Sequence, residues 1–259
     1  MYFVEDIPIN ADTIVKAYKK YYSLQFENPS YKLLNLFGIR VSTSNVAQPD
    51  DFLGAIRLNS GYTTLDYYDF VICRASTEAS PVWVSKPFDS EARRKGGTAF
   101  LREGQHLYEY ISPKNSPSSW SDGSRTCSFC PITPRPVYRW LPTQVEINAY
   151  RKGASISANF ERDLIASRKL NFKNSRVKLS DSTDTCIHRA WNLPFTNDSA
   201  GCQVIHPNDV ATSFRTICSW AKQHIDKKYP NTFVYTLFTK EQFLAANRTK
   251  KLGLGIFGL

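Results

Sequence analysis

Short apolar runs rich in β-branched and aromatic residues, each bounded by Pro, Asn, Ser or Gly, constrain this chain most strongly. Such runs are typical of buried strands, and they occupy residues 31–40, 68–75 and 232–238. Two further runs, 98–101 and 106–111, are separated by a Glu-Gly turn signal and predict a hairpin. Residues 49–61 are less regular and are interpreted as a connecting loop with an edge strand. We therefore expect a β-rich fold.

Helices are expected at both ends of the chain. Asn10 can cap a helix over residues 10–25, where apolar side chains recur at helical spacing. A longer amphipathic helix is predicted from residue 208, with lysines near its end and Pro230 after it, and a short one over 241–247. No stretch approaches the roughly 20 apolar residues of a membrane span. The predicted fold class is α+β, a β-rich domain with flanking helices.

A chain of 259 residues with 42% apolar residues can bury one large core, so we expect one main domain. We divide the chain into an N-terminal helical segment (1–30), the main domain (31–247) and a tail that is basic and then apolar (248–259). Within the main domain, residues 112–180 are interpreted as a loop-rich insertion. Ser, Pro and Gly are dense in its first part, 112–136, and disfavour both helix and ladder.

The formal net charge of +10 favours anionic partners, whether nucleic acid, acidic lipid or wall polymer, without choosing among them. The basic residues are scattered, which is typical of solvated surface, and nucleic acid is not the favoured partner. The first residues lack the basic and apolar pattern of a secretory signal. If the protein, made in the cytoplasm, acts outside it, we expect delivery by a phage lysis system or a secretion system.

Cys202 and His188 are the residues with the clearest chemical potential. A free thiol has a pKa of about 8.5, so it is a weak nucleophile at neutral pH unless an imidazole or a cation favours the thiolate. His188 can do this if the strand that ends there lies beside the strand that begins at Cys202. The structural alternative is a buried cysteine and a hydrogen-bonded core histidine, which are common in proteins.

The segment Ser-Ala-Gly-Cys at 199–202 resembles the Ser/Thr-His-Gly-Cys signature of the L,D-transpeptidase catalytic domain. Ile-His-Arg-Ala at 187–190 sits where the upstream histidine of that family belongs. The chain is most similar to phage and bacterial proteins in which an Ile-His-Arg-Ala segment is followed by Ser-Ala-Gly-Cys-Gln-Val. The likeness spans roughly residues 31–240 and is poor from about 112 to 180.

The resemblance implies a cysteine-dependent acyl-transfer enzyme, a peptidase or an L,D-transpeptidase, that acts on peptidoglycan stem peptides. It implies Cys202 as the nucleophile and His188 as its base. Ser199 and Gly201 would shape the oxyanion site, where backbone amides face the oxygen of a tetrahedral intermediate. The fold that it implies is a β-rich L,D-transpeptidase-like catalytic domain. No cofactor is expected.

Two positions depart from the family pattern. Ala200 replaces a histidine, and Val204 replaces the Arg or Asn that commonly follows the cysteine by two positions. Arg189 is a candidate for the missing charge, as a bidentate partner of a peptide carboxylate. Ala200 and Gln203, which flank the nucleophile, complete the predicted substrate-binding set.

The remaining cysteines and histidines have simpler interpretations. Cys127 and Cys130 form a CxxC without the two further ligands that a zinc site needs, so a local disulfide or two plain thiols are favoured and no metal is expected. His206 is a weaker substitute for His188 or a residue that supports it. The residues expected to be structural or in the core are Cys73, Cys186, Cys218, His106 and His224.

Several functional alternatives stay open at this point. Water as the acyl acceptor makes the enzyme a peptidase, and an amine makes it a transpeptidase. A phage lysis enzyme (an endolysin) and a secreted antibacterial effector would use the same chemistry. A different class is a catalytically inactive binding or virion-structural module whose basic surface holds wall polymer or nucleic acid. The sequence does not indicate an oligomeric state.

Overall fold

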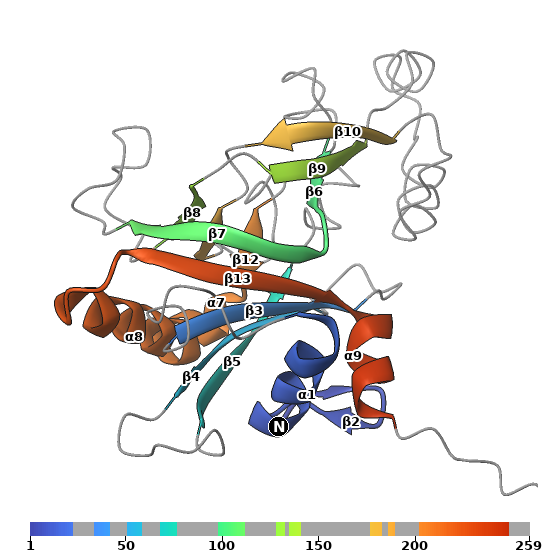
Figure 1. Ribbon diagram of the computed structural model, residues 1–259, viewed down its shortest axis with the longest axis horizontal. Helices are drawn as coiled ribbons and strands as arrows, with labels where there is room; N and C mark the ends of the chain where they lie inside the picture. The colour runs from blue at the N-terminus through green and yellow to red at the C-terminus, as the bar shows by residue number, and fades with distance from the viewer. Residues whose placement is uncertain are drawn as a thin grey trace, which may run out of the picture.

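The structure is a computed structural model, and it describes residues 1–22, 34–41, 51–58, 68–76, 98–111, 128–132, 135–140, 177–182, 186–189 and 202–248. At its centre is a closed barrel with the strand order β11-β12-β5-β4-β3-β13-β7-β8 (Figure 1). The barrel strands are β3 (Leu34–Arg40), β4 (Asp51–Leu58), β5 (Tyr68–Ser76), β7 (Gly104–Ile111), β8 (Ser128–Pro131), β11 (Ile187–Arg189), β12 (Gln203–Ile205) and β13 (Thr232–Thr239).

Smaller elements surround the barrel. A three-stranded sheet has the order β10-β9-β6, and a two-stranded hairpin lies at the N-terminus. Their strands are β6 (Thr98–Leu101), β9 (Arg135–Trp140), β10 (Val177–Ser182), β1 (Phe3–Val4) and β2 (Ile7–Pro8). The helices are α1 (Ala11–Tyr21), α7 (Pro207–Asp209), the π-helix η3 (Val210–Phe214), α8 (Arg215–Asp226) and α9 (Lys240–Asn247). The mixed content around a β-rich core agrees with the predicted α+β class.

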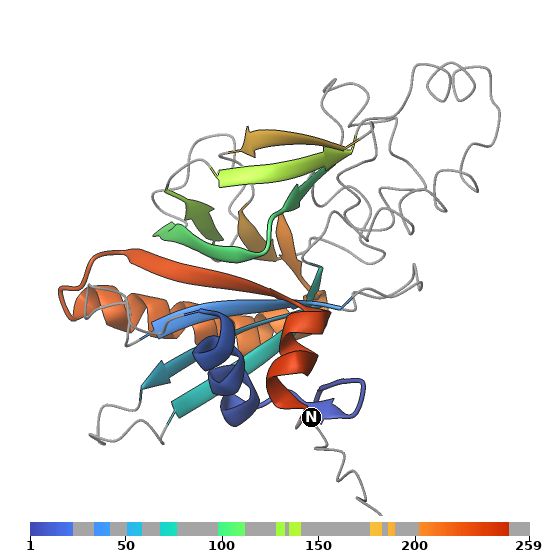
Figure 2. The same cartoon turned by 45° about the vertical axis from the view of Figure 1, so that its right-hand side comes forward.

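Two hydrophobic clusters lie on the two faces of the barrel wall formed by β3, β4, β5 and β13, because side chains alternate along a strand. The first cluster joins one face to helix α8 and includes Leu36, Leu53, Cys73, Phe214 and Ile217. The second joins the alternate residues to α1 and α9 and includes Tyr18, Phe37, Ile39, Phe238 and Phe243. Figure 2 shows α1 and α9 side by side.

The predicted helices and the three strongest strands are confirmed. Asn10 caps α1, since its side-chain oxygen accepts a hydrogen bond of 3.0 Å from the Thr13 amide. The helix predicted from residue 208 is present as α7, η3 and α8, and the chain leaves α8 before Pro230. Among the described residues, no helix is long and apolar enough to cross a membrane.

The interpretation of residues 49–61 as a loop with an edge strand is wrong. β4 lies between β3 and β5 and pairs with both along its length. Gly54 explains part of the error, because a Cβ there would come within 2.4 Å of the Phe37 ring and of the Val71 carbonyl oxygen. The close packing of a central strand therefore requires a residue that has low strand propensity.

The predicted hairpin over 98–111 is also wrong, although both strands exist. β6 pairs with β9, whereas β7 pairs with β13 and β8. The long pairing of β7 with β13 runs from Gly104 to Glu109, and this tertiary partner outweighs the local turn signal. Gly104 is the described glycine with a positive φ, at +129°, which marks the change of direction between the two sheets.

Residues 112–136 were expected to form no ladder, but β8 closes the barrel there. β8 pairs with β7 and with β11, and the start of β9 also falls in this stretch. Phe129 provides the reason, since its ring is buried against Tyr110 and Phe233 at centroid distances of 5.3 and 5.6 Å. One buried aromatic residue thus outweighs a composition that disfavours strands. The rest of β9 and the first residues of β10 also fall within the predicted insertion, whereas 112–127, 133–134, 141–176 and the tail from 249 lie outside the described residues.

Candidate active site

Three cysteines come together because β8, β11 and β12 are neighbours in the barrel. β11 runs parallel to β12 with Ile187 beside Gln203, and antiparallel to β8 with Ile187 opposite Phe129. One residue away along each register, Cys186 is beside Cys202 and opposite Cys130. The amide of Gln203 donates to the Cys186 carbonyl at 2.8 Å, which extends the ladder to this position. We call Cys130, Cys186 and Cys202 the thiol row.

The alternation of side chains places the thiol row and His188 on one face of these strands. Phe129, Ile187 and Ile205 belong to the first hydrophobic cluster and mark the opposite face. His188 follows Cys186 by two residues on β11, so it lies on the same face as the thiols. It is in register with Val204, which follows Cys202 by two residues on β12. His188 is therefore a diagonal neighbour of Cys202.

Hydrogen bonds connect the thiols to one another and to the imidazole. The Sγ atoms of Cys130 and Cys186 are 3.0 Å apart. The pKa of the Cys202 thiol is held well below its ordinary value by a hydrogen bond from Cys186 and, against the effect of burial, by a hydrogen bond and the charge of His188. The pKa of Cys186 is raised, because its thiol proton is shared with Cys130 and Cys202 and the side chain is buried. Cys202 is half-buried as a residue, whereas Cys186 is buried.

The orientation of the His188 ring follows from its second hydrogen bond. Nδ1 lies 2.7 Å from the carbonyl oxygen of Arg189, and a carbonyl oxygen can only accept, so Nδ1 carries a proton in this contact. In the neutral ring the basic nitrogen is then Nε2. The ring is 3% exposed, so the carbonyl holds one tautomer in a buried position next to a thiol.

The predicted site residues divide into two groups. The expected adjacency of the strands at His188 and Cys202 is confirmed, while their catalytic roles stay predictions. Arg189 and Gln203 alternate to the opposite face of β11 and β12 from the thiol row. Gln203 is fully buried and accepts a hydrogen bond of 3.1 Å from the Tyr108 hydroxyl, and Arg189 is half-buried. The structure therefore does not bring these two predicted substrate contacts to Cys202.

The predicted oxyanion residues Ser199 and Gly201, and Ala200 between them, lie outside the described residues. Cys127 lies outside them as well, and Cys130 is a free thiol, so a local disulfide between these two is excluded. Cys73 and Cys186 are buried as predicted, and Cys218 is buried and disulfide-bonded. The contact of Cys186 with Cys202 was missed, although its spacing of two residues from His188 in a strand would have placed both on one face.

The other histidines have structural partners. Nε2 of His106 lies 2.7 Å from the Arg102 carbonyl oxygen, and the His224 ring packs on Phe233 and Tyr229 at 5.0 and 4.8 Å. No group of three or more His, Cys, Asp or Glu side chains in the described part of the chain has the arrangement of a metal site. The thiol row agrees with this result, because three residues in a line across three strands do not surround a common point.

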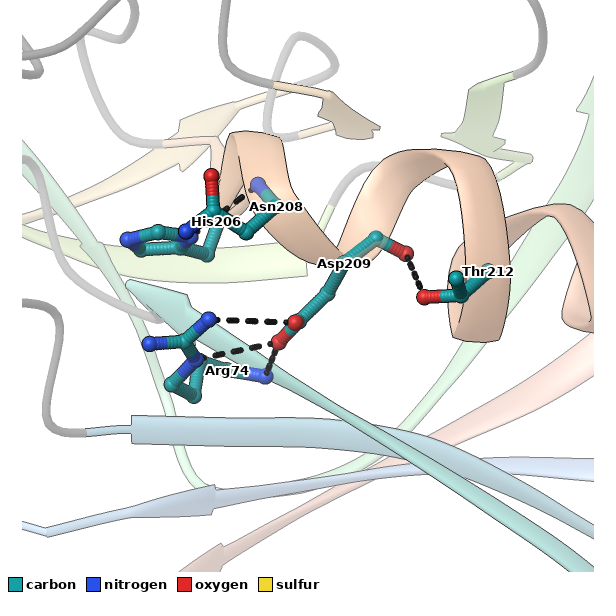
Figure 3. A network of polar contacts seen from close by, with 5 residues as sticks. All are labelled: Arg74, His206, Asn208, Asp209 and Thr212. Atoms are coloured by element: carbon teal, nitrogen blue, oxygen red, sulfur yellow. Dashed lines mark hydrogen bonds and ion pairs between the residues drawn. The ribbon is translucent and has the colours of Figure 1, made fainter.

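A second polar network fixes the other end of β12 (Figure 3). Asp209 is buried, and its Oδ2 accepts the Arg74 backbone amide at 2.7 Å and the Nε of that guanidinium at 3.2 Å. The second carboxylate oxygen accepts Nη2 at 3.2 Å. The His206 amide donates to the Arg74 carbonyl at 2.9 Å, and its Nδ1 accepts from the Asn208 amide. This network joins β5, β12 and α7, and so holds the strand that follows Cys202.

Asp209→Asn is expected to lower the free energy of unfolding at pH 7 by about 1–3 kcal/mol, because the half-buried guanidinium of Arg74 loses the charge of the buried carboxylate that binds it. Burial raises the pKa of Asp209, but the hydrogen bonds from Arg74 outweigh it and hold the pKa below its ordinary value. A carboxyl group with a lowered pKa stabilises the fold above its unfolded pKa of about 3.9, and this stability is lost as the pH falls through the folded pKa. Urea unfolding at pH 7 and in acid measures both effects.

The matched control for this variant is Asp69→Asn. Asp69 pairs with Arg57 at 2.8 Å, but both side chains are about one-third exposed. An exposed pair contributes about 0.2–1 kcal/mol, so the control should change stability little. Equal losses in the two variants, or an unchanged acid transition in Asp209→Asn, would contradict the role assigned to Asp209.

Comparison of the chain with protein-family models, with curated proteins and with solved structures returns no match.

Proposed function

We propose that this chain is a cysteine-dependent acyl-transfer enzyme with an L,D-transpeptidase-like catalytic domain. The observation that supports the proposal is the interaction of His188 with the Cys202 thiol, which lowers the pKa of that thiol, while Nδ1 of the ring lies against a backbone carbonyl. A nucleophile, a base within hydrogen-bonding reach and a group that orients the base are the parts that covalent catalysis requires. The parallel pairing of β11 with β12 accounts for the proximity of these two side chains, since it makes the strand of His188 a neighbour of the strand that follows Cys202.

In the proposed mechanism, His188 accepts the thiol proton of Cys202 through Nε2. The thiolate attacks a substrate carbonyl carbon, and the resulting tetrahedral intermediate collapses when the imidazolium returns the proton to the leaving amine. The product is a thioester on Cys202 and a free amine. Water or a second amine then attacks the thioester, with its proton taken by His188, and the thiolate leaves. Water makes the reaction hydrolysis, and an amine makes it transpeptidation.

The proposed substrates are peptidoglycan stem peptides. This assignment rests on the resemblance of the segments at 187–190 and 199–202 to the L,D-transpeptidase signature. The net charge of +10 is compatible with attraction to anionic wall polymer. Because alternation places Arg189 on the opposite face from Cys202, the residue that holds the peptide carboxylate is left open.

Purified muropeptides with tetrapeptide and pentapeptide stems test the proposal directly. We expect loss of a terminal residue in water, or its exchange for an added amino acid, detected by mass spectrometry of the products. Acid quenching during turnover should trap an acyl adduct on the peptide that contains Cys202. Absence of both product and adduct, together with tight and salt-dependent binding of nucleic acid, would favour the binding module instead.

A further inference from the structure

We propose that the thiol row is a disulfide relay, in which Cys186 and Cys130 rescue Cys202 after oxidation by a hydroperoxide. The relay rests on the proposed function only in that Cys202 must be a reactive thiolate. It does not depend on the acyl substrate. It makes Cys186 and Cys130 the site of a reversible disulfide. Neither residue has a role in the acyl-transfer mechanism.

The geometry satisfies the requirements of both possible disulfides. Cys186 is a direct cross-strand neighbour of Cys202 in a parallel pair and of Cys130 in an antiparallel pair. Neighbouring strands lie about 4.8 Å apart, within the range of about 4.4–6.8 Å between the Cα atoms of disulfide-bonded cysteines. The Sγ atoms of Cys130 and Cys186 are already in contact at 3.0 Å. The strand spacing therefore places Cys186 within disulfide-bonding reach of either neighbour.

The burial of the three thiols sets the order of events. Cys202 and Cys130 are half-buried, whereas Cys186 is 1% exposed. A peroxide dissolved in water thus meets Cys202 or Cys130 rather than Cys186. The thiolate is the form that reacts, and the neighbours of Cys202 lower its pKa. Cys186 lies beside Cys202, where a resolving cysteine is needed.

The first two steps place a disulfide on the nucleophile. The thiolate of Cys202 attacks one oxygen of hydrogen peroxide, an S–O bond forms, the O–O bond breaks, and the released hydroxide takes up a proton to become water. Cys202 is now a sulfenic acid. The Cys186 sulfur attacks the sulfenic sulfur, an S–S bond forms, the S–O bond breaks, and the departing hydroxide combines with the Cys186 thiol proton as water.

The third step frees the nucleophile. Cys130 loses its proton to solvent and attacks the Cys186 sulfur, the bond between Cys186 and Cys202 breaks, and Cys202 leaves as a thiolate. A thiol with a lowered pKa is the better leaving group, which favours release of Cys202 over the reverse exchange. In total, one peroxide oxidises Cys130 and Cys186 to a disulfide and gives two waters, and Cys202 is unchanged.

Peroxide treatment of the full chain, followed by alkylation and non-reducing peptide mapping, tests the relay. In the unmodified protein we expect a disulfide between Cys130 and Cys186, with Cys202 still alkylated. Cys130→Ser should stop the relay at the bond between Cys186 and Cys202, with loss of Cys202 alkylation that a dithiol reverses. Cys186→Ser should let Cys202 gain two oxygen atoms as a sulfinic acid, a loss that a dithiol does not reverse.

The control is Cys73→Ser. Cys73 is a free thiol on β5, and burial and nearby Asp209 raise its pKa, so this variant should give the disulfides of the unmodified protein. Two results would overturn the relay: sulfinic acid on Cys202 in the unmodified protein, or an equally fast disulfide between Cys130 and Cys186 in Cys202→Ser. Alkylation before peroxide separates the two proposals. A reactive Cys202 that forms no disulfide within the thiol row rejects the relay alone, whereas an unreactive Cys202 rejects the acyl-transfer enzyme too.

Discussion

Cys202→Ala is expected to abolish turnover of muropeptides, with a loss on the order of 10⁴-fold or more, while the barrel stays folded. The sulfur is the atom that would form the thioester, and no neighbouring group can replace it on the proposed path. The side chain is half-buried and precedes β12, so its truncation should disturb the packing little. Initial rates on the muropeptides, together with thermal unfolding, separate chemistry from stability.

Cys73→Ala is the matched control for the nucleophile. It removes another free thiol from the same barrel, but one that is buried in the first hydrophobic cluster on β5. This variant is expected to lose some stability and to keep its turnover. Retained turnover in Cys202→Ala would refute the mechanism, and equal losses in both variants would point to damage of the fold.

The sequence predicted the helices and strands whose own residues show a helical spacing or a strand-like composition. Helical spacing of apolar residues predicted α1 and α8, and runs of β-branched and aromatic residues predicted β3, β5 and β13. The adjacency of β11 and β12 was predicted from the spacing of His188 and Cys202 together with a family signature. Chemistry and pattern agreed there, and the structure places these strands side by side.

The errors occurred where tertiary pairing outweighs local signals. β4 contains Gly54, which reads as a loop residue until the Phe37 ring that packs against it is known. The turn signal before β7 predicted a hairpin, but β13 offers a longer partner. β8 depends on one buried ring, Phe129, within a polar stretch. In each case the deciding contact comes from a distant part of the chain, which a local pattern cannot report.

The candidate site, like the fold, has one part that the sequence could predict and one part that depends on tertiary pairing. Alternation alone could have separated His188 and Cys186 from Arg189, because the period of a strand is two residues. The thiol row could not be predicted, since it depends on the antiparallel register of β8 with β11 and on the parallel register of β11 with β12. Phe129 and Ile187 pair across β8 and β11 and are both buried in the core. The spacing of the cysteines in the sequence does not predict this register.

His188→Ala is expected to raise the apparent pKa for alkylation of Cys202. The hydrogen bond from Cys186 and then the hydrogen bond and charge of His188 lower this pKa, while burial raises it. Without the imidazole, the pKa-raising effect of burial is opposed by fewer stabilising contacts. The pKa of Cys202 should therefore rise toward or above the value of about 8.5 of a free thiol. Once the pKa lies above the pH of the measurement, each further unit of increase lowers the thiolate fraction about tenfold. The rate of iodoacetamide labelling of Cys202 as a function of pH measures the change.

His206→Gln is the control for this measurement, because His206 lies at the opposite end of β12 and contacts Asn208 and Arg74. Its alkylation profile should match that of the unmodified protein. Cys186→Ala should also raise the pKa, since the hydrogen bond from Cys186 is the largest of the stabilising contacts. If neither His188→Ala nor Cys186→Ala moves the profile, the thiol is not activated by its neighbours. A barrel with an inert Cys202 would then be better explained as a binding or structural module than as an enzyme.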